Sequence, residues 1–137
     1  MQDTTIKGLT NEILCELDFT KRGILISKPI TVDSKYDYII DYNQKLYKIQ
    51  CKSSSLGKDG TYIHFGTMTK NIRSGKNNYY SKEDIDFFYT SYNGQGYLVP
   101  VERAGKGDTR LRFSSLTQNP IIKWASDYEL DKQLSLL

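Results

Sequence analysis

The sequence predicts an α/β domain in which helices flank a mixed β-sheet, and three observations lead to this fold class. A helical repeat of apolar residues opens the chain, short runs of β-branched and aromatic residues fill its middle, and a second helical repeat closes it. The chain has 137 residues, 38% of them apolar, and shows no internal repeat. We therefore expect one domain over residues 1–137.

The first predicted element is a helix over residues 4–22. Its apolar positions recur at helical spacing and are expected to pack on the sheet: Ile6, Leu9, Ile13 and Leu17. Gly23 should end this helix, because glycine readily adopts the left-handed conformation that follows a helix C-terminus. A short apolar strand over residues 23–27 is expected next, ended by Pro29.

Residues 35–41 and 45–53 are predicted to form a β-hairpin, because both runs are rich in β-branched and aromatic residues. If Asn43 and Gln44 form a two-residue loop, Tyr42 pairs with Lys45. This register decides which polar side chains of the two strands meet.

In that register Asp37 lies directly opposite Gln50, and Lys52 projects from the same face as Gln50. A carboxylate, an amide and an ammonium group would then cluster on one face of the hairpin. Carboxylate and amide oxygens can bind a hard divalent cation, while a lysine can orient water and stabilise charge on a phosphate. A solvated face of an amphipathic hairpin is the alternative explanation.

The rest of the chain gives shorter elements, and the overall order is α-β-β-β-(loop)-α-β-β-α. We expect a strand over 61–66, a long mobile loop over 67–81, a short helix near 81–84, paired strands over 86–92 and 96–101 around Asn93-Gly94, a glycine-rich stretch over 104–110, a last strand over 111–113 and a C-terminal helix from about 124 to 136.

A metal site needs more oxygen ligands than Asp37 and Gln50 supply, and the first helix offers two carboxylates. Glu12 and Glu16 lie one turn apart on the flank of the apolar stripe. Either could reach the polar end of the hairpin, and a surface-exposed pair remains the alternative. The residues alone leave the choice between Glu12 and Glu16 open.

The net charge is +3, and the positive charge is concentrated between residues 52 and 82, where six cations meet one acid. This distribution permits a nucleic-acid partner. The candidate DNA contacts are basic or polar residues in the predicted loops and at the end of the hairpin: Ser53, Lys58, Lys70, Arg73, Lys76, Asn77, Arg103, Lys106 and Arg110. For any single one of them, a solvated loop residue is the alternative.

Several classes of function find no support. Cys15 and Cys51 lack disulfide-framework or metal-site spacing and are expected as buried thiols. His64 is the only histidine, so an ordinary strand residue is expected there. No secretory signal or membrane-spanning run is seen, so we expect a cytoplasmic protein without a membrane partner. The glycines near 105–107 do not form a phosphate loop, so no nucleotide cofactor is expected.

Five segments together resemble the PD-(D/E)XK nuclease superfamily over roughly residues 5–100. They are Gly8-x-x-x-Glu12, Gly23, the strand ending at Pro29, Tyr36-Asp37, and Ile49-Gln50-Cys51-Lys52-Ser53. The resemblance implies a restriction-endonuclease-like core in α-β-β-β-α-β order. By the same likeness Glu12 is the helix carboxylate, Asp37 the central metal ligand, and Lys52 the catalytic lysine.

Gln50 stands where most of the superfamily carries Glu or Asp. A Gln-x-Lys motif is similar to that of the bacterial group I intron-encoded homing endonucleases, so the resemblance implies a site-specific DNA endonuclease using Mg²⁺, with Mn²⁺ as a substitute. Its partner would be double-stranded DNA. A chain this small cannot span a long target alone, so a homodimer or homotetramer is expected. A Holliday-junction resolvase, a restriction-type enzyme and an inactive DNA-binding module remain alternatives.

Overall fold

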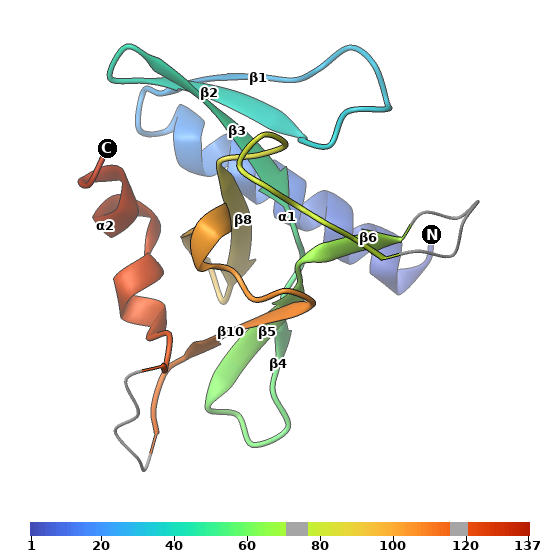
Figure 1. Ribbon diagram of the computed structural model, residues 1–137, viewed down its shortest axis with the longest axis vertical. Coiled ribbons are helices and arrows are strands. Elements are labelled where there is room, and N and C mark those ends of the chain that lie inside the picture. Colours follow the sequence, from blue (N-terminus) through green and yellow to red (C-terminus); the bar gives the residue numbers. More distant parts are fainter. Residues whose placement is uncertain (71–76, 116–120) are drawn as a thin grey trace.

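A computed structural model describes residues 1–70, 77–115 and 121–137, without the side chains of Lys70, Asn77 and Asn78. Its strands form a five-stranded sheet in the order β1-β2-β3-β8-β9, a three-stranded sheet in the order β10-β5-β4, and the pair β6-β7 (Figure 1). The elements are α1 (Asp3–Thr20), β1 (Leu25–Ser27), β2 (Tyr38–Tyr42), β3 (Lys45–Cys51), β4 (Ser55–Leu56), β5 (Tyr62–Gly66), β6 (Met68–Lys70), β7 (Asn77–Tyr79), β8 (Phe87–Tyr92), β9 (Gln95–Pro100), the 3₁₀ helix η1 (Val101–Arg103), β10 (Asp108–Arg112), the 3₁₀ helix η2 (Ala125–Tyr128) and α2 (Leu130–Leu134).

The central hairpin has the predicted register. Tyr42 pairs with Lys45, and Tyr38 pairs with Ile49. Asn43 and Gln44 have φ angles of 50° and 66°, which is the conformation that a two-residue hairpin loop requires. The hairpin prediction is therefore confirmed over the paired residues from Tyr38 to Ile49, and the predicted pair of Asp37 and Gln50 lies one position beyond them.

The hairpin strand β3 pairs with β8 in parallel, and the chain between them forms β4, β5 and the β6-β7 pair. The helix predicted near residues 81–84 is wrong, because this segment forms only a turn. Ile85 donates a backbone hydrogen bond to Ser81 at 3.1 Å, and Asp86 already donates to Lys48 at 2.9 Å. The backbone enters the sheet before a helix can extend.

Three other boundaries differ from the predictions. The predicted loop over 67–81 contains β6 and β7, which pair antiparallel on either side of residues 71–76, a segment outside the described residues. Strand β10 begins at Asp108, inside the predicted glycine-rich stretch, because five residue pairs join it to β5. The C-terminal helix is split into η2 and α2 at Glu129, which has extended backbone angles.

Two apolar cores lie on opposite faces of the large sheet. The first joins α1 and α2 to the sheet, and includes Cys15, Phe19, Ile49 and Leu130. The second lies between the large sheet and the inner face of the small one, which lies below it in Figure 1. Cys15 and Cys51 are buried free thiols, as predicted. A helix therefore covers one face of the sheet, and the small sheet covers the other.

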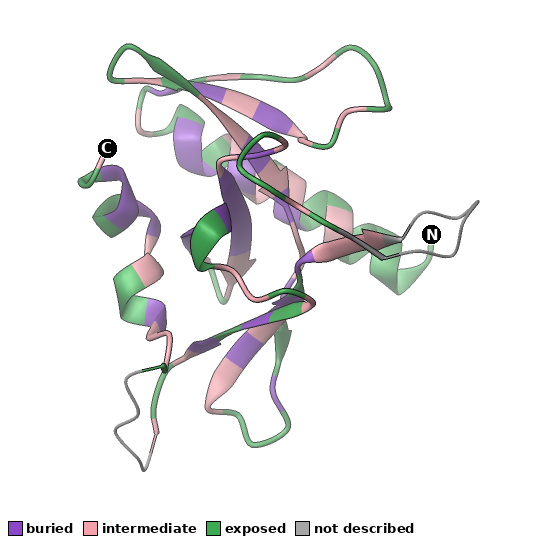
Figure 2. Cartoon of the chain, in the orientation of Figure 1, coloured by how far each residue is buried: buried purple, intermediate pink, exposed green. Residues whose placement is uncertain are grey.

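The predicted orientation of the first helix is wrong. The expected apolar stripe is the exposed side of α1, with Ile6, Leu9, Ile13 and Leu17 at 46%, 45%, 62% and 53% exposure (Figure 2). The buried side instead carries Cys15 and Phe19, which pack in the first core, and two polar residues that find partners in β8. Asn11 accepts a 2.7 Å hydrogen bond from Ser91, and Asp18 accepts one of 2.5 Å from Tyr89.

No helix in the described part of the chain is both long and apolar enough to cross a lipid bilayer.

Candidate active site

Asp37 lies immediately before β2 and is attached to β3 by two hydrogen bonds. Its backbone N–H donates to the carbonyl of Ile49 at 2.9 Å, and its carboxylate oxygen Oδ2 accepts from the backbone N–H of Cys51, also at 2.9 Å. The carboxylate is therefore held against the strand that carries Gln50 and Lys52, as the register predicts.

Gln50 lies near the end of β3, and Lys52 follows directly after this strand. Gln50 pairs with Phe88 in the parallel ladder, and its amide nitrogen Nε2 donates to the carbonyl of Cys51 at 3.4 Å. Within the described part of the chain, no hydrogen bond engages the amide oxygen of Gln50. The ammonium nitrogen of Lys52 lies 5.2 Å from the ring centroid of Tyr80, a cation–π contact that holds the half-buried side chain in place.

The two glutamates of α1 have different surroundings. Glu16 accepts a 2.7 Å hydrogen bond from the Tyr38 hydroxyl and lies 3.5 Å from the ammonium group of Lys28. Glu12 instead lines the same cleft as Asp37, and no hydrogen bond among the described residues engages its carboxylate. This arrangement brings Glu12, rather than Glu16, toward the carboxylate of Asp37.

The cleft between α1 and the start of β2 has a volume of about 250 Å³. One wall is the segment that joins β1 to β2, and the other comes from α1 and β2. The lining residues are Glu12, Lys28, Pro29, Thr31, Val32, Ser34, Tyr36, Asp37 and Tyr38. The cleft thus holds two of the candidate site residues, Glu12 and Asp37, whereas Gln50 and Lys52 are not among its lining residues.

Burial shifts the pKa values of three charged groups in this site. It raises the pKa of Asp37, although the hydrogen bond from Cys51 and the charge of Lys52 act in the opposite direction. Burial and then the negative charge of Asp37 raise the pKa of Glu12. Burial also lowers the pKa of Lys52. Two carboxylates that repel each other in a partly dry cleft would both gain from a bound cation.

The donor set fits a hard divalent ion. Asp37 and Glu12 offer carboxylate oxygens, and Gln50 offers an amide oxygen, which are the atoms that Mg²⁺ prefers. No group of three or more His, Cys, Asp or Glu residues in metal-binding arrangement occurs among the described residues. With two acids rather than three, water or substrate oxygens would have to complete the ligand shell.

Sequence reasoning missed two residues of the site, Lys28 and Tyr80. Lys28 lines the cleft and is close enough to Asp37 and Glu12 to lower the pKa of both carboxyls. Tyr80 packs over Lys52, and burial raises its own pKa to about 12. No local pattern marks either residue. Lys28 lies in the segment between β1 and β2 and Tyr80 directly follows β7, and the path of neither segment follows from the sequence.

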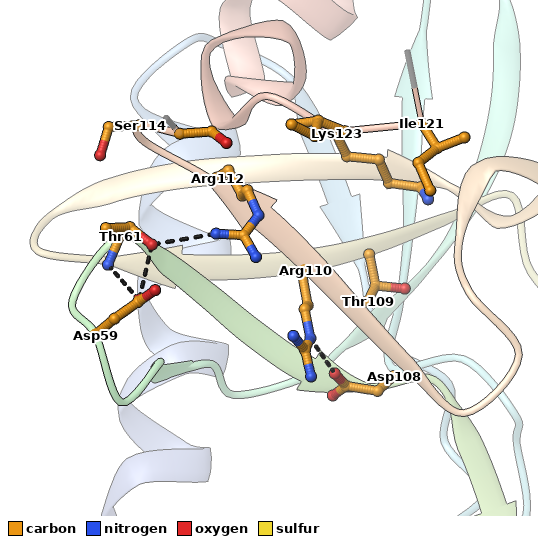
Figure 3. A pocket seen from close by; sticks show the side chains of 11 residues that line it. Asp59, Thr61, Asp108, Thr109, Arg110, Arg112, Ser114, Ile121 and Lys123 are labelled. Carbon is orange, nitrogen blue, oxygen red and sulfur yellow. Dashed lines mark hydrogen bonds and ion pairs between the residues drawn. The ribbon is translucent and has the colours of Figure 1, made fainter. Parts of the chain in front are cut away.

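The candidate DNA contacts do not share one surface. Ser53 is half-buried directly after Lys52, and Lys58 and Lys106 are exposed in turns. Arg110 lies in a groove beside β10 (Figure 3), whereas Arg103 lines a different hollow beside α2.

Four more candidates fall on or next to the part of the chain that is not described. Lys70 and Asn77 lie at the ends of β6 and β7, without described side chains. Arg73 and Lys76 lie outside the described residues.

The helix α1 and the hairpin of β2 and β3 thus surround a carboxylate, an amide and a lysine. A family model described as PD-(D/E)XK endonuclease matches residues 2–131. The chain therefore belongs to the PD-(D/E)XK endonuclease family.

A search of solved structures gives a similar fold in a bacterial protein. The match is to the structure titled as that of a bacterial homing endonuclease, I-Ssp6803I, with a TM-score of 0.78 and 23% sequence identity. It covers 98% of this chain and 94% of the other. At this level of identity the match establishes the shared fold. No curated protein matches the sequence.

Proposed function

We propose that this protein, as one nuclease domain over residues 1–137, is a site-specific DNA endonuclease that hydrolyses phosphodiester bonds with Mg²⁺, for which Mn²⁺ can substitute. The observation that carries the proposal is the cleft in which Glu12 from α1 approaches Asp37, whose carboxylate is bonded to the strand of Lys52. Membership of the PD-(D/E)XK endonuclease family supports the same chemistry.

Each residue has a distinct role in this proposal. Asp37 and Glu12 hold the cation through their carboxylates, and the amide oxygen of Gln50 adds a neutral ligand. The bound ion would polarise the phosphate and lower the pKa of a water molecule. Lys52 orients the attacking water and neutralises charge that develops on the phosphate oxygens. Its lowered pKa suits this role, because a partly dehydrated ammonium interacts more strongly with an anion.

We further propose that the enzyme is an intron-encoded homing endonuclease. The support is the Gln-x-Lys motif at Gln50 and Lys52, together with the fold match to a structure titled as a bacterial homing endonuclease. A junction resolvase or a restriction-type enzyme would use the same site on a different substrate. An inactive DNA-binding module would keep the fold and bind DNA without cutting it.

Plasmid cleavage tests the chemistry. Purified wild-type protein should cut DNA with Mg²⁺ or Mn²⁺ and not in EDTA. Lys52→Ala should lower the rate by about 10²- to 10⁴-fold, because it removes a group that acts in the transition state. Cleavage that persists in EDTA or survives the substitution contradicts the mechanism.

Two further comparisons separate the alternatives. Cleavage rates on linear duplexes and on four-way junctions distinguish a site-specific enzyme from a resolvase. If wild type binds DNA without cutting it, and Gln50→Glu restores cutting by adding a negative charge to the ligand set, the inactive-module alternative is correct.

We also propose that the protein acts as a homodimer or homotetramer. One cleft cuts one strand, so a second copy is needed to cut both strands of a duplex. The exposed stripe of α1 (Ile6, Leu9, Ile13 and Leu17) supports this proposal, because four apolar side chains on one helix face are costly to leave in water.

A further inference from the structure

The outward face of the small sheet carries a dense group of hydrogen-bonding side chains that the catalytic site does not use. In the β5-β10 ladder Tyr62 pairs with Arg112, and His64 pairs with Arg110. The residues between them, such as Ile63 and Leu111, are fully buried against the large sheet. Because side chains alternate along a strand, the polar set must point away from the core.

The ring of Tyr62 contacts the guanidinium groups of two arginines on this face. The guanidinium carbons of Arg110 and Arg112 both lie 4.9 Å from the centroid of its ring. The ring is itself fixed, because it packs so closely on Gly57 that a Cβ there would overlap it. Stacked guanidinium groups lose little rotamer entropy when they bind a ligand, since their orientation is set beforehand.

Among the described residues, few side-chain bonds engage the donors of the two arginines. Arg112 donates a hydrogen bond of 3.2 Å to the hydroxyl of Thr61. Arg110 has a long contact of 3.7 Å to Asp108, whose other oxygen lies 3.2 Å from the ring nitrogen Nδ1 of His64. A guanidinium has five N–H donors. Each arginine can therefore offer a pair of N–H groups to a planar acceptor.

An open groove runs along this face beside β10. Its volume is about 920 Å³. The close-up in Figure 3 shows the side chains of Arg110, Arg112 and Lys123 along it, with Asp59 and Asp108 also present. The groove thus offers both donors and acceptors. A surface that binds only phosphates would need cations alone, whereas base edges present donors and acceptors together.

We propose that this outward face, formed by Tyr62, His64, Arg110 and Arg112, reads base edges in the major groove of the DNA target. The inference rests on the proposed nuclease function and adds the surface that would recognise the target sequence in the DNA. An antiparallel β-ribbon fits the major groove, which is about 12 Å wide. Arg110 and Arg112 would each donate two hydrogen bonds to a guanine, which is the commonest specific contact of arginine.

The connection to the catalytic strand limits which bases are read. Only two residues separate Lys52 from Ser55, so the two Cα atoms lie no more than about 11 Å apart, since adjacent Cα atoms are about 3.8 Å apart. Ser55 pairs with His64 on β5, and His64 pairs with Arg110 on β10, which adds two strand spacings of about 5 Å each. At about 3.4 Å per base pair, the backbone of Arg110 lies within roughly six base pairs of Lys52.

The test is selection of bound duplexes from a randomised library in EDTA, where binding is separated from cutting. Wild type should enrich a sequence containing guanines. The variants Arg110→Lys and Arg112→Lys keep the positive charge but lose the planar guanidinium group, which can donate two parallel hydrogen bonds. Each should lower the preference at one guanine about 5- to 100-fold, while affinity for unrelated duplexes changes less than about twofold. Tyr62→Leu should weaken both preferences, and Tyr62→Phe should retain them.

Arg22→Lys is the matched control, because it makes the same change at an arginine that bonds Asp18 and Asp131, away from the outward face, and it should leave the selected sequence unaltered. Unchanged preferences in the Arg110 and Arg112 variants overturn the inference. A uniform loss of affinity for all sequences overturns it as well, because it would assign these arginines to phosphates. Plasmid cleavage by wild type separates failure of this inference from failure of the nuclease proposal.

Discussion

The carboxylate of Asp37 accepts its hydrogen bond from the backbone N–H of Cys51, at 2.9 Å, and not from a side chain. Cys51 stands between Gln50 and Lys52 on β3. The distance between the acid and the neighbouring lysine is therefore set by main-chain geometry. An asparagine at position 37 can accept the same hydrogen bond, so the charge of this residue can be removed while its placement is kept.

Asp37→Asn should make metal-free protein more stable, and the gain should grow with pH. The fold raises the pKa of Asp37 above its ordinary value of 3.8, so the folded state favours the protonated carboxyl. The contribution of the protonated carboxyl to folding stability is fully present below the ordinary pKa and is lost as pH rises through the raised pKa. The gain in unfolding free energy should stay below about 1 kcal/mol, because solvent screens a partly exposed group.

Urea unfolding of both proteins in EDTA, from pH 4 to pH 7, measures this difference. Saturating Mg²⁺ at pH 7 should reverse the order, because an ion that binds only the folded wild type stabilises it. A stability difference that does not vary with pH would contradict the prediction.

The two glutamates of α1 offer a matched pair of variants. Glu12→Gln should lower the cleavage rate at least about 100-fold and raise the Mg²⁺ concentration needed, since it removes one of two charged ligands. Glu16→Gln should change the rate less than about fivefold. It should cost about 1 kcal/mol of stability, because it weakens the hydrogen bond from Tyr38. Titration of activity with Mg²⁺ distinguishes them, and equal losses would reject the assignment of Glu12.

Replacing an apolar residue of the exposed stripe should dissociate the oligomer. We expect wild type to have a mass that is a multiple of 15.8 kDa in solution, and Ile13→Lys to shift it toward the monomer. Leu46→Lys is the matched control, because Leu46 is also exposed, at 68%, but lies on the central hairpin. Light scattering after size-exclusion chromatography gives both masses. A monomeric wild type would remove the proposed role of the stripe.

Thr90 offers a test of the core beneath the site. Its side chain is fully buried in β8, and its hydroxyl has no hydrogen-bond partner among the described residues. Thr90→Val replaces that hydroxyl with a methyl group of similar shape and should raise the unfolding free energy by about 1 kcal/mol. Thermal unfolding of the two proteins measures the change. A loss of stability would mean that a water molecule bonds the hydroxyl.

The central hairpin was predictable because its register follows from one short loop. Once Asn43 and Gln44 are assigned to the turn, the position of every side chain on β2 and β3 is determined. The choice of Glu12 over Glu16 could not be made this way, because it depends on how α1 is rotated about its axis. That rotation is set by Asn11 and Asp18, whose partners Ser91 and Tyr89 lie far along the chain.

The apolar repeat of α1 was misleading for the same reason. Periodicity identifies an amphipathic helix, but it does not say which of two surfaces its apolar side contacts. Ile13 and Leu17 fit packing against the sheet and packing against a second copy equally well. The boundaries of β6, β7 and β10 could not be predicted either, because pairing between strands determines them, and not local propensity. β6 and β7 pair with each other, and β10 pairs with β5.

The parallel pairing of β3 with β8 has a consequence for synthesis of the protein. Gln50 lies in an edge strand until Phe88 has been made, since β8 is the neighbour that places β3 inside the sheet. The backbone N–H of Lys52 also finds its acceptor, the carbonyl of Tyr89, in β8. A ribosome-bound chain that ends before β8 therefore holds every side chain of the proposed catalytic site and still lacks the strand that completes the sheet around it. Nuclease activity should begin only after the strand that completes the sheet has left the ribosome.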